Sequence, residues 1–405
     1  MPTPSKNIAV ALLTGGGDRP YALGLASTLD SQRVLIDFIG SDDLDLPELR
    51  RVPSLNFLNL RGDQRSDAPI IQKLLRITTY YVRLLRYSIT ARPKIFHILW
   101  NNRFELFDRT ILMIYYRLLG KRLVLTAHNV NAAKRDGNDT FLNRASLSLQ
   151  YRLADHIFVH TSKMKSELVN DFDVRPHKIS EIPLGLNDTV PISDLTAMEA
   201  RKRLGIDIHE RVLLFFGRIS PYKGLEYLVR ALADVCNTYA HYRLLIVGSV
   251  QNCAEYWENV QMEIRQLGIQ ARVITRIEFV PDHETELYFK GSDVLVLPYA
   301  DVFQSGVLVL AYSFGLPVIA ADVGCLSEDV VDGQTGYIFR SKNSADLARK
   351  IEIYFASSLF RDLESRRHDI RDYANKKYSW AQVGQITRNV YETLSDECSQ
   401  RASDG

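Results

Sequence analysis

A chain of 405 residues is too long to fold around one hydrophobic core, so its length predicts two domains. With 46% hydrophobic residues, 24% charged residues and a net charge of +2, the composition is typical of an ordered globular protein and excludes a disordered or fibrous chain. The apolar runs are too short to cross a bilayer, and the four cysteines lack metal-ligand spacing, so we expect a cytoplasmic protein with reduced thiols.

The charge is unevenly distributed along the chain. Residues 1–180 carry 26 Lys and Arg against 17 Asp and Glu, whereas the remainder carries 24 against 31. A basic first half predicts an anionic partner. Nucleic acid is not expected, because the basic residues contain no recognition motif and no interleaved aromatic run. A membrane surface or a phosphorylated acceptor fits the charge better.

The first predicted element is an apolar strand at 8–13, which runs into three glycines at 15–17 and an amphipathic helix at 20–29. Further apolar strands follow at 33–39, 95–99, 122–126 and 156–160. Continuous apolar strands are typical of a parallel sheet buried on both faces, and their alternation with helices predicts a doubly wound α/β domain. We expect Gly16 and Gly17 to face the ligand, although many dinucleotide-binding folds have such a turn.

The segment 73–89 predicts an amphipathic helix. On a helical wheel its apolar residues share one arc, whereas Lys73, Arg76, Arg83 and Arg86 occupy the other. Two interpretations remain open. The helix lies on an anionic membrane surface at the inner face of the membrane, or it packs on its own sheet with a solvated basic face. The second interpretation places residues such as Leu74, Tyr81 and Leu84 in the core.

A histidine, His128, follows the predicted strand 122–126. Side chains just past the carboxyl end of a strand lie where open α/β sheets bind their ligands. The imidazole pKa lies near neutrality, so this side chain could transfer a proton or hold a hydroxyl group. The alternative is a loop histidine that bonds only to the backbone.

The pattern of strands breaks at 182–193, where prolines and glycines interrupt it, and then begins again. Strands are predicted at 212–216, 244–247, 294–298 and 318–320, with helices between them. The sequence therefore predicts a second doubly wound α/β domain. We place the first domain at 1–188 and the second at 189–380, and the terminal helix at 381–400 could pack back on the first.

Two cations follow the strand 212–216, namely Arg218 and Lys223, on a loop that leads into a helix. A diphosphate leaving group gains negative charge as it departs, and fixed cations aimed at that charge stabilise it. The pair could therefore bind a diphosphate. The alternative is a surface loop with two solvated cations.

A second polar loop, 299–306, lies between the strand 294–298 and an apolar helix. Ser305 and Gly306 stand at the start of that helix, where free N–H groups and the helix dipole favour phosphate. Glycine also lets a ligand approach the backbone closely. The alternative is that Ser305 only caps the helix.

Together these loops resemble the donor domain of GT-B glycosyltransferases, particularly family 4. The matching motifs are Gly-Arg…Lys-Gly at 217–224, Gly-Leu-Pro-Val at 315–318, an acidic and glycine-rich stretch at 328–336, and Tyr-Ser-Trp at 378–380. The resemblance implies two Rossmann-like domains that face a central cleft. It also implies transfer of a hexose from a nucleotide-diphosphate sugar to a glycan or lipid-linked acceptor, in polysaccharide or glycoconjugate biosynthesis, without a metal or another cofactor.

The resemblance implies roles for individual residues. Its expected catalytic residues are His128, Arg218 and Lys223. Its expected donor-binding residues are Gly16, Gly17, Asp301, Gln304, Ser305, Gly306, Val307 and Glu328.

One departure from the family pattern concerns two glutamates that lie eight positions apart in family 4. Their places hold Val302 and Leu310 here. A leucine accepts no hydrogen bond from a ribose, although Asp301 stands beside the first position and could replace its carboxylate. The resemblance favours transfer with retention of configuration at the anomeric carbon, but Val302 and Leu310 do not support it. A nucleotide-sugar epimerase or hydrolase of the same fold and a non-catalytic scaffold remain alternatives.

Overall fold

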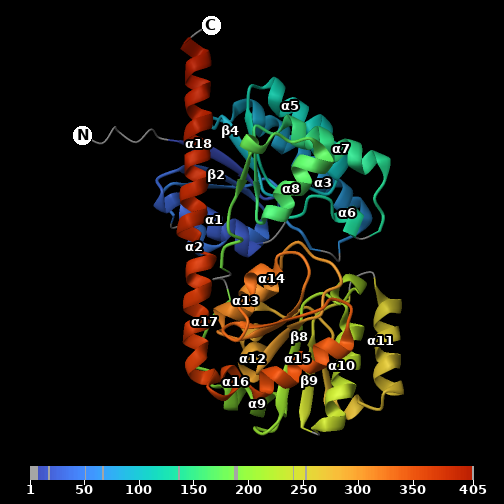
Figure 1. Ribbon diagram of the computed structural model, residues 1–405. Helices are drawn as coiled ribbons and strands as arrows, with labels where there is room; N and C mark the ends of the chain where they lie inside the picture. Colours follow the sequence, from blue (N-terminus) through green and yellow to red (C-terminus); the bar gives the residue numbers. More distant parts are fainter. Residues whose placement is uncertain are drawn as a thin grey trace, which may run out of the picture. The chain divides into compact units, whose positions relative to one another are not determined.

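The computed structural model describes residues 8–16, 19–50, 52–65, 68–135, 137–186, 190–239, 241–250 and 253–403. The chain forms two compact units, one of Met1–Gly185 with Ser379–Gly405 and one of Leu186–Tyr378 (Figure 1). Each unit has its own parallel sheet with helices around it. The prediction of two doubly wound α/β domains is confirmed.

The first unit contains a seven-stranded sheet in the order β3-β2-β1-β4-β5-β6-β7. Its strands are β1 (Ala9–Leu13), β2 (Leu35–Gly40), β3 (Leu55–Asn59), β4 (Ile95–Ile98), β5 (Arg122–Thr126), β6 (His156–Val159) and β7 (Ile179–Glu181). The strand order reverses between β1 and β4, so the loops after these strands diverge at the carboxyl edge of the sheet. Ligands of open α/β sheets bind at such a point.

Helices cover both faces of this sheet, with α1 and α18 on one face and α5, α7 and α8 on the other (Figure 1). The helices of the unit are α1 (Arg19–Ser31), η1 (Asp42–Leu44), α2 (Pro47–Arg50), α3 (Ile70–Thr90), α4 (Glu105–Phe107), η2 (Asp108–Leu112), α5 (Met113–Leu118), α6 (Ala132–Arg135), α7 (Phe141–Leu153), α8 (Ser162–Phe172), η3 (Pro176–Lys178) and α18 (Trp380–Ser403). The label η marks short helical segments that are not α-helical.

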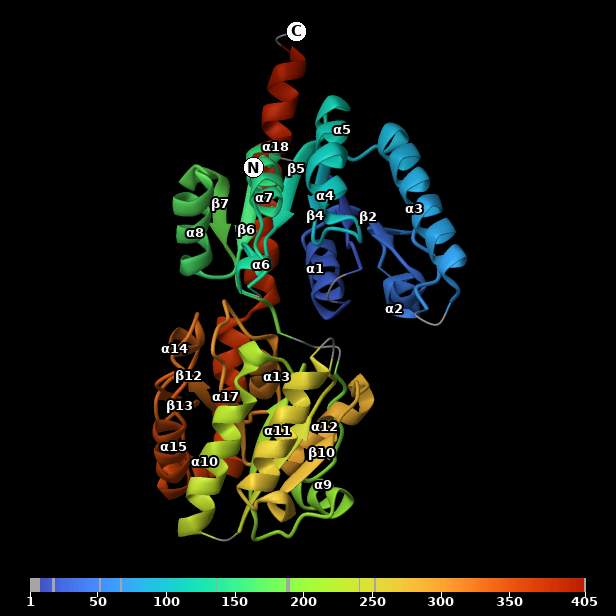
Figure 2. The same ribbon diagram turned by 90° about the vertical axis from the view of Figure 1, so that its right-hand side faces the viewer.

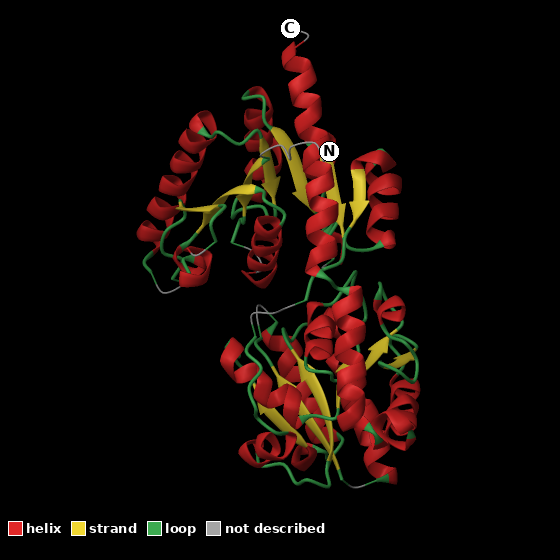
Figure 3. Cartoon of the chain, turned by 90° about the vertical axis from the view of Figure 1, so that its left-hand side faces the viewer, coloured by secondary structure: helices red, strands yellow, loops and turns green. Residues whose placement is uncertain are grey.

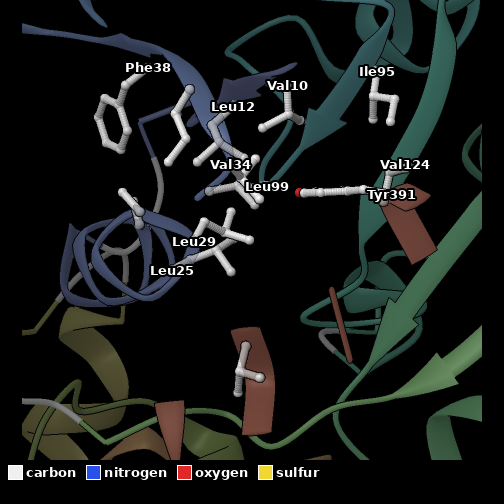
Figure 4. Packing of buried hydrophobic residues seen from close by; sticks show 14 of the residues in the cluster. Val10, Leu12, Leu25, Leu29, Val34, Phe38, Ile95, Leu99, Val124 and Tyr391 are labelled. Atoms are coloured by element: carbon white, nitrogen blue, oxygen red, sulfur yellow. The ribbon is translucent and has the colours of Figure 1, made fainter. Parts of the chain in front are cut away.

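The terminal helix α18 completes the core of the first unit. Figure 4 shows Val10 and Leu12 of β1 with Leu25 and Leu29 of α1, and Tyr391 of α18 within the same cluster. The hydroxyl of Tyr391 lies 2.6 Å from Nδ1 of His97 on β4. Each Å² of apolar surface that α18 buries in this cluster stabilises the fold by about 25 cal/mol. The core of the first unit is therefore complete only when α18 is packed on it.

Helix α3 leaves much of its apolar surface exposed. Tyr80, Leu84 and Ser88 are buried, whereas Leu74 is 54% exposed. The other exposed large hydrophobic residues of α3 are Ile70, Ile71, Leu75, Val82 and Ile89. The interpretation that placed Leu74 in the core is therefore wrong, because α3 contacts the unit through a narrow stripe that centres on Leu84.

The second unit contains a six-stranded sheet in the order β10-β9-β8-β11-β12-β13. Its strands are β8 (Arg211–Phe216), β9 (Tyr242–Val247), β10 (Val273–Arg276), β11 (Val294–Leu297), β12 (Val318–Ala321) and β13 (Gly336–Phe339). The order reverses between β8 and β11, so the loops after these two neighbouring strands lie at the switch point on the carboxyl edge of the sheet. These are the two loops that the sequence marked as a diphosphate site.

Figure 3 shows this sheet with helices packed around it. The helices are α9 (Ala197–Leu204), η4 (Pro221–Lys223), α10 (Leu225–Thr238), α11 (Ala254–Gln266), η5 (Gln270–Arg272), α12 (Asp282–Gly291), α13 (Gly306–Ser313), α14 (Leu326–Asp329), α15 (Ser344–Ala356), α16 (Ser358–Arg361) and α17 (Leu363–Lys377). Helix α13 is apolar on all sides and buries Leu308, Leu310 and Tyr312, as expected of a helix inside the unit.

Candidate active site

The two predicted loops of the second unit contact each other at Gly224. Its φ of 62° is in the left-handed region, and a side chain there would overlap the carbonyl of Pro298 at the end of β11. Glycine therefore allows the loop after β8 to pack against the end of β11. The amide of Ala300 also donates to the carbonyl of Tyr222 at 2.8 Å.

Lys223 is buried, and its ammonium group contacts Tyr299 at the start of the second loop. Nζ donates to the Tyr299 hydroxyl at 2.5 Å and lies 3.9 Å from the centre of its ring. Tyr299 is 1% exposed, and this burial raises the pKa of its hydroxyl. The side chain therefore keeps its proton and holds the lysine in one position.

Tyr299 also connects Lys223 to helix α13. Its hydroxyl lies 3.4 Å from Oγ of Ser305, and that Oγ accepts the amide of Leu308 at 3.3 Å as the N-cap of α13. The side chain of Ser305 thus takes the capping role that we considered as its alternative. The cation of Lys223 and the first turn of α13 are joined by one chain of contacts.

The start of α13 is accessible. Gly306 is exposed, and a Cβ added there would meet nothing within 4 Å. The first amides of a helix have no acceptor within that helix, and the dipole makes its N-terminus positive. Gly306 and the half-buried Val307 provide such amides. This turn can accept an anionic group.

The remaining predicted residues of this unit are more exposed. Arg218 and Asp301 are exposed on the two loops, Gln304 is half-buried, and Glu328 is exposed on α14. The amide of Cys325 donates to the carbonyl of Phe303 at 3.0 Å, which ties the segment before α14 to the second loop.

The two positions that depart from the family pattern are both apolar and buried. Val302 and Leu310 are each 7% exposed. Neither supplies an acceptor for a sugar or ribose hydroxyl. Asp301, beside Val302, is the carboxylate of this loop that solvent reaches.

In the first unit the glycine turn lies against two neighbouring loops. Gly16 has a φ of 77°, and a side chain there would overlap the guanidinium of Arg61. A side chain at Gly15 would overlap the carbonyl of Trp100. The backbone of Trp100 leaves no room for a side chain at Gly15, whereas at Gly16 the positive φ favours glycine and the flexible guanidinium can move aside. Gly17, the other predicted donor-binding glycine, lies outside the described residues.

His128 follows β5 and is held by aromatic and histidine neighbours. Its ring lies parallel to Trp100, with centroids 4.1 Å apart, and edge-on to Tyr21 at 4.7 Å. Its Nδ1 is 3.1 Å from Nε2 of His160. His128, Trp100 and Asn129 are among the residues that line a cavity of about 380 Å³.

The hydrogen bonds determine which nitrogen of His128 carries the proton. Nδ1 of His160 lies 3.2 Å from the carbonyl of Ile182, which can only accept. Burial lowers the pKa of His160 to about 4, so its ring is neutral and its Nε2 accepts from His128. Nδ1 of His128 is then the donor, and its Nε2 keeps a lone pair. Among the described residues this Nε2 has no hydrogen-bond partner.

Burial, with smaller contributions from His160 and His97, lowers the pKa of His128 well below its ordinary value. The ring is therefore neutral at physiological pH. A neutral imidazole with a free Nε2 can accept a hydrogen bond or a proton from a hydroxyl group. The lowered pKa makes His128 a weak base that stays neutral and keeps the Nε2 lone pair available.

The structure thus groups the predicted residues into two sets, one on each unit. Three contributors were missed by sequence reasoning, namely Tyr299, Trp100 and His160. Tyr299 and Trp100 lie two residues after the ends of β11 and β4, and this position was the available signal. His160 gave no signal beyond its place at the end of β6.

The described part of the chain contains no group of three or more His, Cys, Asp or Glu residues that could hold a metal ion. In the same residues, no helix combines the length and apolar character needed to cross a membrane.

Comparison with known protein families assigns both units. Residues 197–377 match the family described as "Glycosyl transferases group 1", and residues 15–190 match "Glycosyltransferase Family 4". The chain belongs to the group 1 glycosyltransferases of GT-B fold and is a glycosyltransferase. The family expected from the loop motifs is confirmed.

Curated relatives include D-inositol 3-phosphate glycosyltransferases. The protein of Corynebacterium aurimucosum is 28% identical over 282 residues, which span 66% of this chain and 65% of that protein, slightly less than two thirds of its length. The protein of Corynebacterium glutamicum is 25% identical over 393 residues, which span 93% of this chain and 91% of that protein.

Solved structures share the fold. Sucrose-phosphate synthase from Thermosynechococcus elongatus has a TM-score of 0.75 at 18% identity, with 96% of this chain and 100% of that chain covered. The Anabaena HepE protein in complex with UDP-glucose has a TM-score of 0.72 at 18% identity, with the same coverage. At such identities the likeness shows the fold alone.

Proposed function

We propose that this glycosyltransferase moves a hexose from a nucleotide-diphosphate sugar to a glycan or lipid-linked acceptor in the biosynthesis of a polysaccharide or glycoconjugate. The observation that carries this proposal is the contact chain from Lys223 through Tyr299 and Ser305 to the start of α13. It holds a cation beside an exposed helix N-terminus, which is the arrangement that a diphosphate leaving group needs.

Lys223, Arg218 and the amides of Gly306 and Val307 are the proposed diphosphate ligands. Charge develops on the diphosphate as the bond to the sugar breaks, so groups that are already in position stabilise the transition state without further reorganisation. Asp301, Gln304 and Glu328 are the proposed polar contacts to the rest of the donor. No resident metal or other cofactor is part of this proposal.

His128 is the proposed catalytic residue of the first unit, where its free Nε2 would accept a hydrogen bond from a hydroxyl of the substrate. Gly16 is a proposed donor-binding residue of the first unit; Gly17, which the sequence also predicts, lies outside the described residues. The related D-inositol 3-phosphate glycosyltransferases and the UDP-glucose complex of HepE support a phosphate-bearing acceptor and a uridine nucleotide as first candidates. We favour retention at the anomeric carbon on family resemblance.

The test is a thermal-shift screen of UDP-, GDP- and ADP-sugars, followed by turnover of each stabilising donor with phosphorylated polyol and lipid-linked acceptors. Proton NMR of the first product formed would give its anomeric configuration. Stabilisation by one nucleotide series together with product formation supports transfer. Release of free sugar that no acceptor suppresses indicates a hydrolase, and binding without any turnover indicates a scaffold.

We also propose that the enzyme works at the inner face of the cytoplasmic membrane, with α3 against anionic lipid. The exposed apolar residues of α3 support this, and the adjoining segment extends their surface. Tyr81 of α3 stacks on Phe104 at 6.0 Å, and the Tyr115 hydroxyl donates to the carbonyl of Leu85 at 3.1 Å. Exposed hydrophobic residues of that segment are Phe104, Leu106, Ile111, Ile114 and Leu118.

Figure 2 shows α3, α4 and α5 next to one another in the first unit. An exposed apolar surface of several residues with cations beside it is typical of proteins that bind a membrane interface. Arg83 and Arg86 are exposed on α3 and would contact the lipid headgroups.

A further inference from the structure

A cavity of about 560 Å³ lies beside α3 in the first unit, separate from the residues that surround His128. Its walls come from the segment after β3, from α3 and from the loop after β4. Five of the residues that line it are cationic and none is acidic; they are Arg61, Arg65, Lys73, Arg76 and Arg103. The carboxylate of Asp63 pairs with Arg65 and Arg76, with Oδ2 2.8 and 3.3 Å from their nitrogens, and offsets part of this charge. A ligand of opposite sign would offset the rest.

Arg61 is the central cation of this cavity. Its guanidinium lies over the ring of Tyr80 at 5.4 Å and against Gly16 of the glycine turn. Among the described residues, its buried Nη1 has no hydrogen-bond partner. A buried guanidinium nitrogen without an acceptor costs free energy, and an anionic oxygen in the cavity would remove that cost.

The other walls are fixed by contacts of their own. Arg76 donates to the carbonyls of Asp63 and Arg65 at 2.9 and 3.1 Å, which ties the segment after β3 to α3. The Tyr80 hydroxyl donates to Oδ1 of Asn102 at 2.6 Å, which ties α3 to the loop after β4. The cavity therefore exists before any ligand arrives.

Position and chemistry together indicate the ligand. Arg61, Arg103 and Gly16 follow β3, β4 and β1, so the cavity lies at the same carboxyl edge of the sheet as His128, which follows β5. Guanidinium groups bind the oxygens of a phosphate in pairs, and five cations that share one carboxylate, that of Asp63, favour a group with more than one negative charge. We propose that this cavity binds a phosphate group of the acceptor. The proposal rests on the proposed sugar transfer and specifies its acceptor as phosphorylated.

The phosphate could belong to a free polyol or sugar phosphate or to a lipid. Calorimetric titrations of the full chain should therefore use inorganic phosphate, glycerol 3-phosphate and monomeric dihexanoyl phosphatidic acid. We expect all three to bind, and Arg61→Gln and Arg103→Gln to weaken binding about ten-fold or more, since each removes a charge-assisted contact. Arg103 is exposed, so its variant should fold even if Arg61→Gln does not.

Arg92→Gln is the matched control, because Arg92 is an exposed cation of the same unit that does not line the cavity. Tighter binding of dihexanoyl phosphatidic acid than of glycerol 3-phosphate would support a lipid-linked acceptor. Equal binding of these two phosphate esters would support an acceptor that is a free polyol or sugar phosphate. Failure of all three ligands to bind, or unchanged binding in both cavity variants, overturns the proposal.

The donor site provides the second comparison. Phosphate binding that persists in Arg61→Gln and disappears in Arg218→Gln places the ion at the diphosphate site and also overturns the proposal, while the donor site stands. Phosphate binding that depends on Arg61 in a chain that turns over no nucleotide sugar supports the cavity and contradicts the proposed transfer.

Discussion

The imidazole of His128 lies flat against the indole of Trp100, with 2° between the two planes. This stack covers one face of the imidazole, and the bond to His160 orients its edge. Because burial lowers the pKa of His128 from its ordinary value near 6.5, the ring stays neutral as the pH falls through that value. Transfer that depends on the lone pair of Nε2 should then remain constant from pH 8 to below 6.5.

Trp100→Ala exposes the imidazole to water and should return its pKa toward 6.5. The acid limb of the profile of kcat against pH should therefore move to higher pH in this variant. His128→Ala should lower transfer at every pH by about 100-fold, the usual contribution of a proton-transferring group. An acid limb at the same pH in Trp100→Ala and the wild type would contradict the role of His128.

The diphosphate site predicts graded losses of transfer. Lys223→Ala and Arg218→Ala should each lower kcat about 100-fold, because each removes a charge that stabilises the leaving group. Tyr299→Phe keeps the lysine and loses only the hydroxyl that positions it, so a decrease of about ten-fold is expected. Lys350→Ala is the matched control, since Lys350 also lies over a tyrosine ring, 5.9 Å from Tyr337. Near-normal rates in both charge variants would show that the site is placed wrongly.

Leu310 tests how the donor is recognised. Leu310→Glu restores the residue type of the family, but the side chain is 7% exposed among apolar neighbours. A carboxylate there is costly to bury, and the surrounding residues are not arranged to orient it. We expect no gain in donor affinity by titration calorimetry, and a lower melting temperature. A ten-fold higher donor affinity of Leu310→Glu would mean instead that leucine at position 310 alone accounts for the missing ribose contact.

Membrane association should follow the exposed residues of α3. The protein should sediment with phosphatidylglycerol vesicles, and salt should release it, since charge attraction is screened over about 10 Å at 0.1 M. Arg83→Gln with Arg86→Gln should weaken sedimentation, because each cation contributes about 1 kcal/mol at an anionic surface. Ile71→Ser with Leu75→Ser should weaken it too and leave the fold intact, because both side chains are exposed.

Leu84→Ser provides the contrast on the same helix. Leu84 is fully buried, so its truncation should destabilise the first unit by about 2–5 kcal/mol. Vesicle binding that survives both pairs of substitutions would place the membrane contact elsewhere.

Three buried histidines predict that the first unit loses stability in acid. Burial lowers the pKa of His97 to about 3 and of His156 and His160 to about 4, from an ordinary value of 6.5. Between those values the unfolded chain binds more protons than the folded one. The free energy of unfolding should therefore fall as the pH drops below 6.5, by about 1.4 kcal/mol per pH unit for each histidine.

Urea unfolding of a Trp257→Phe variant measures this effect, because Trp100 and Trp380 of the first unit then supply the fluorescence. His156→Gln should reduce the dependence on pH by the contribution of one histidine. If the free energy of unfolding changes with pH equally in this variant and its parent, His156 is not protonated on unfolding.

Much of the fold follows from the sequence because the central strands are apolar throughout. The strands at the edges of the sheets were not predicted; β3 and β10, for example, are partly exposed and mix apolar with polar residues, as loops do. The two loops of the second unit were found because glycines, cations and a helix cap lie close together in the chain. The partners of Lys223 and His128 were not found, because Tyr299 and His160 reach them from separate strands and only the parallel order of the sheet brings them together.

The amphipathic pattern of 73–89 predicted a helix but could not decide what covers its apolar side. A hydrophobic arc on a wheel is the same whether it contacts a sheet or remains exposed. Only the packing of Leu84 and the exposure of Leu74 separate these cases.

The path of the chain has a consequence for biosynthesis. The first unit lacks part of its core until α18 has been made, and the whole second unit is translated in between. At about 5–20 residues per second, the surface that receives Tyr391 stays uncovered on the ribosome for roughly 10–40 s. During that interval the nascent chain presents an apolar surface to chaperones and to other nascent chains. The second unit, which is continuous in sequence, can fold before the first is complete.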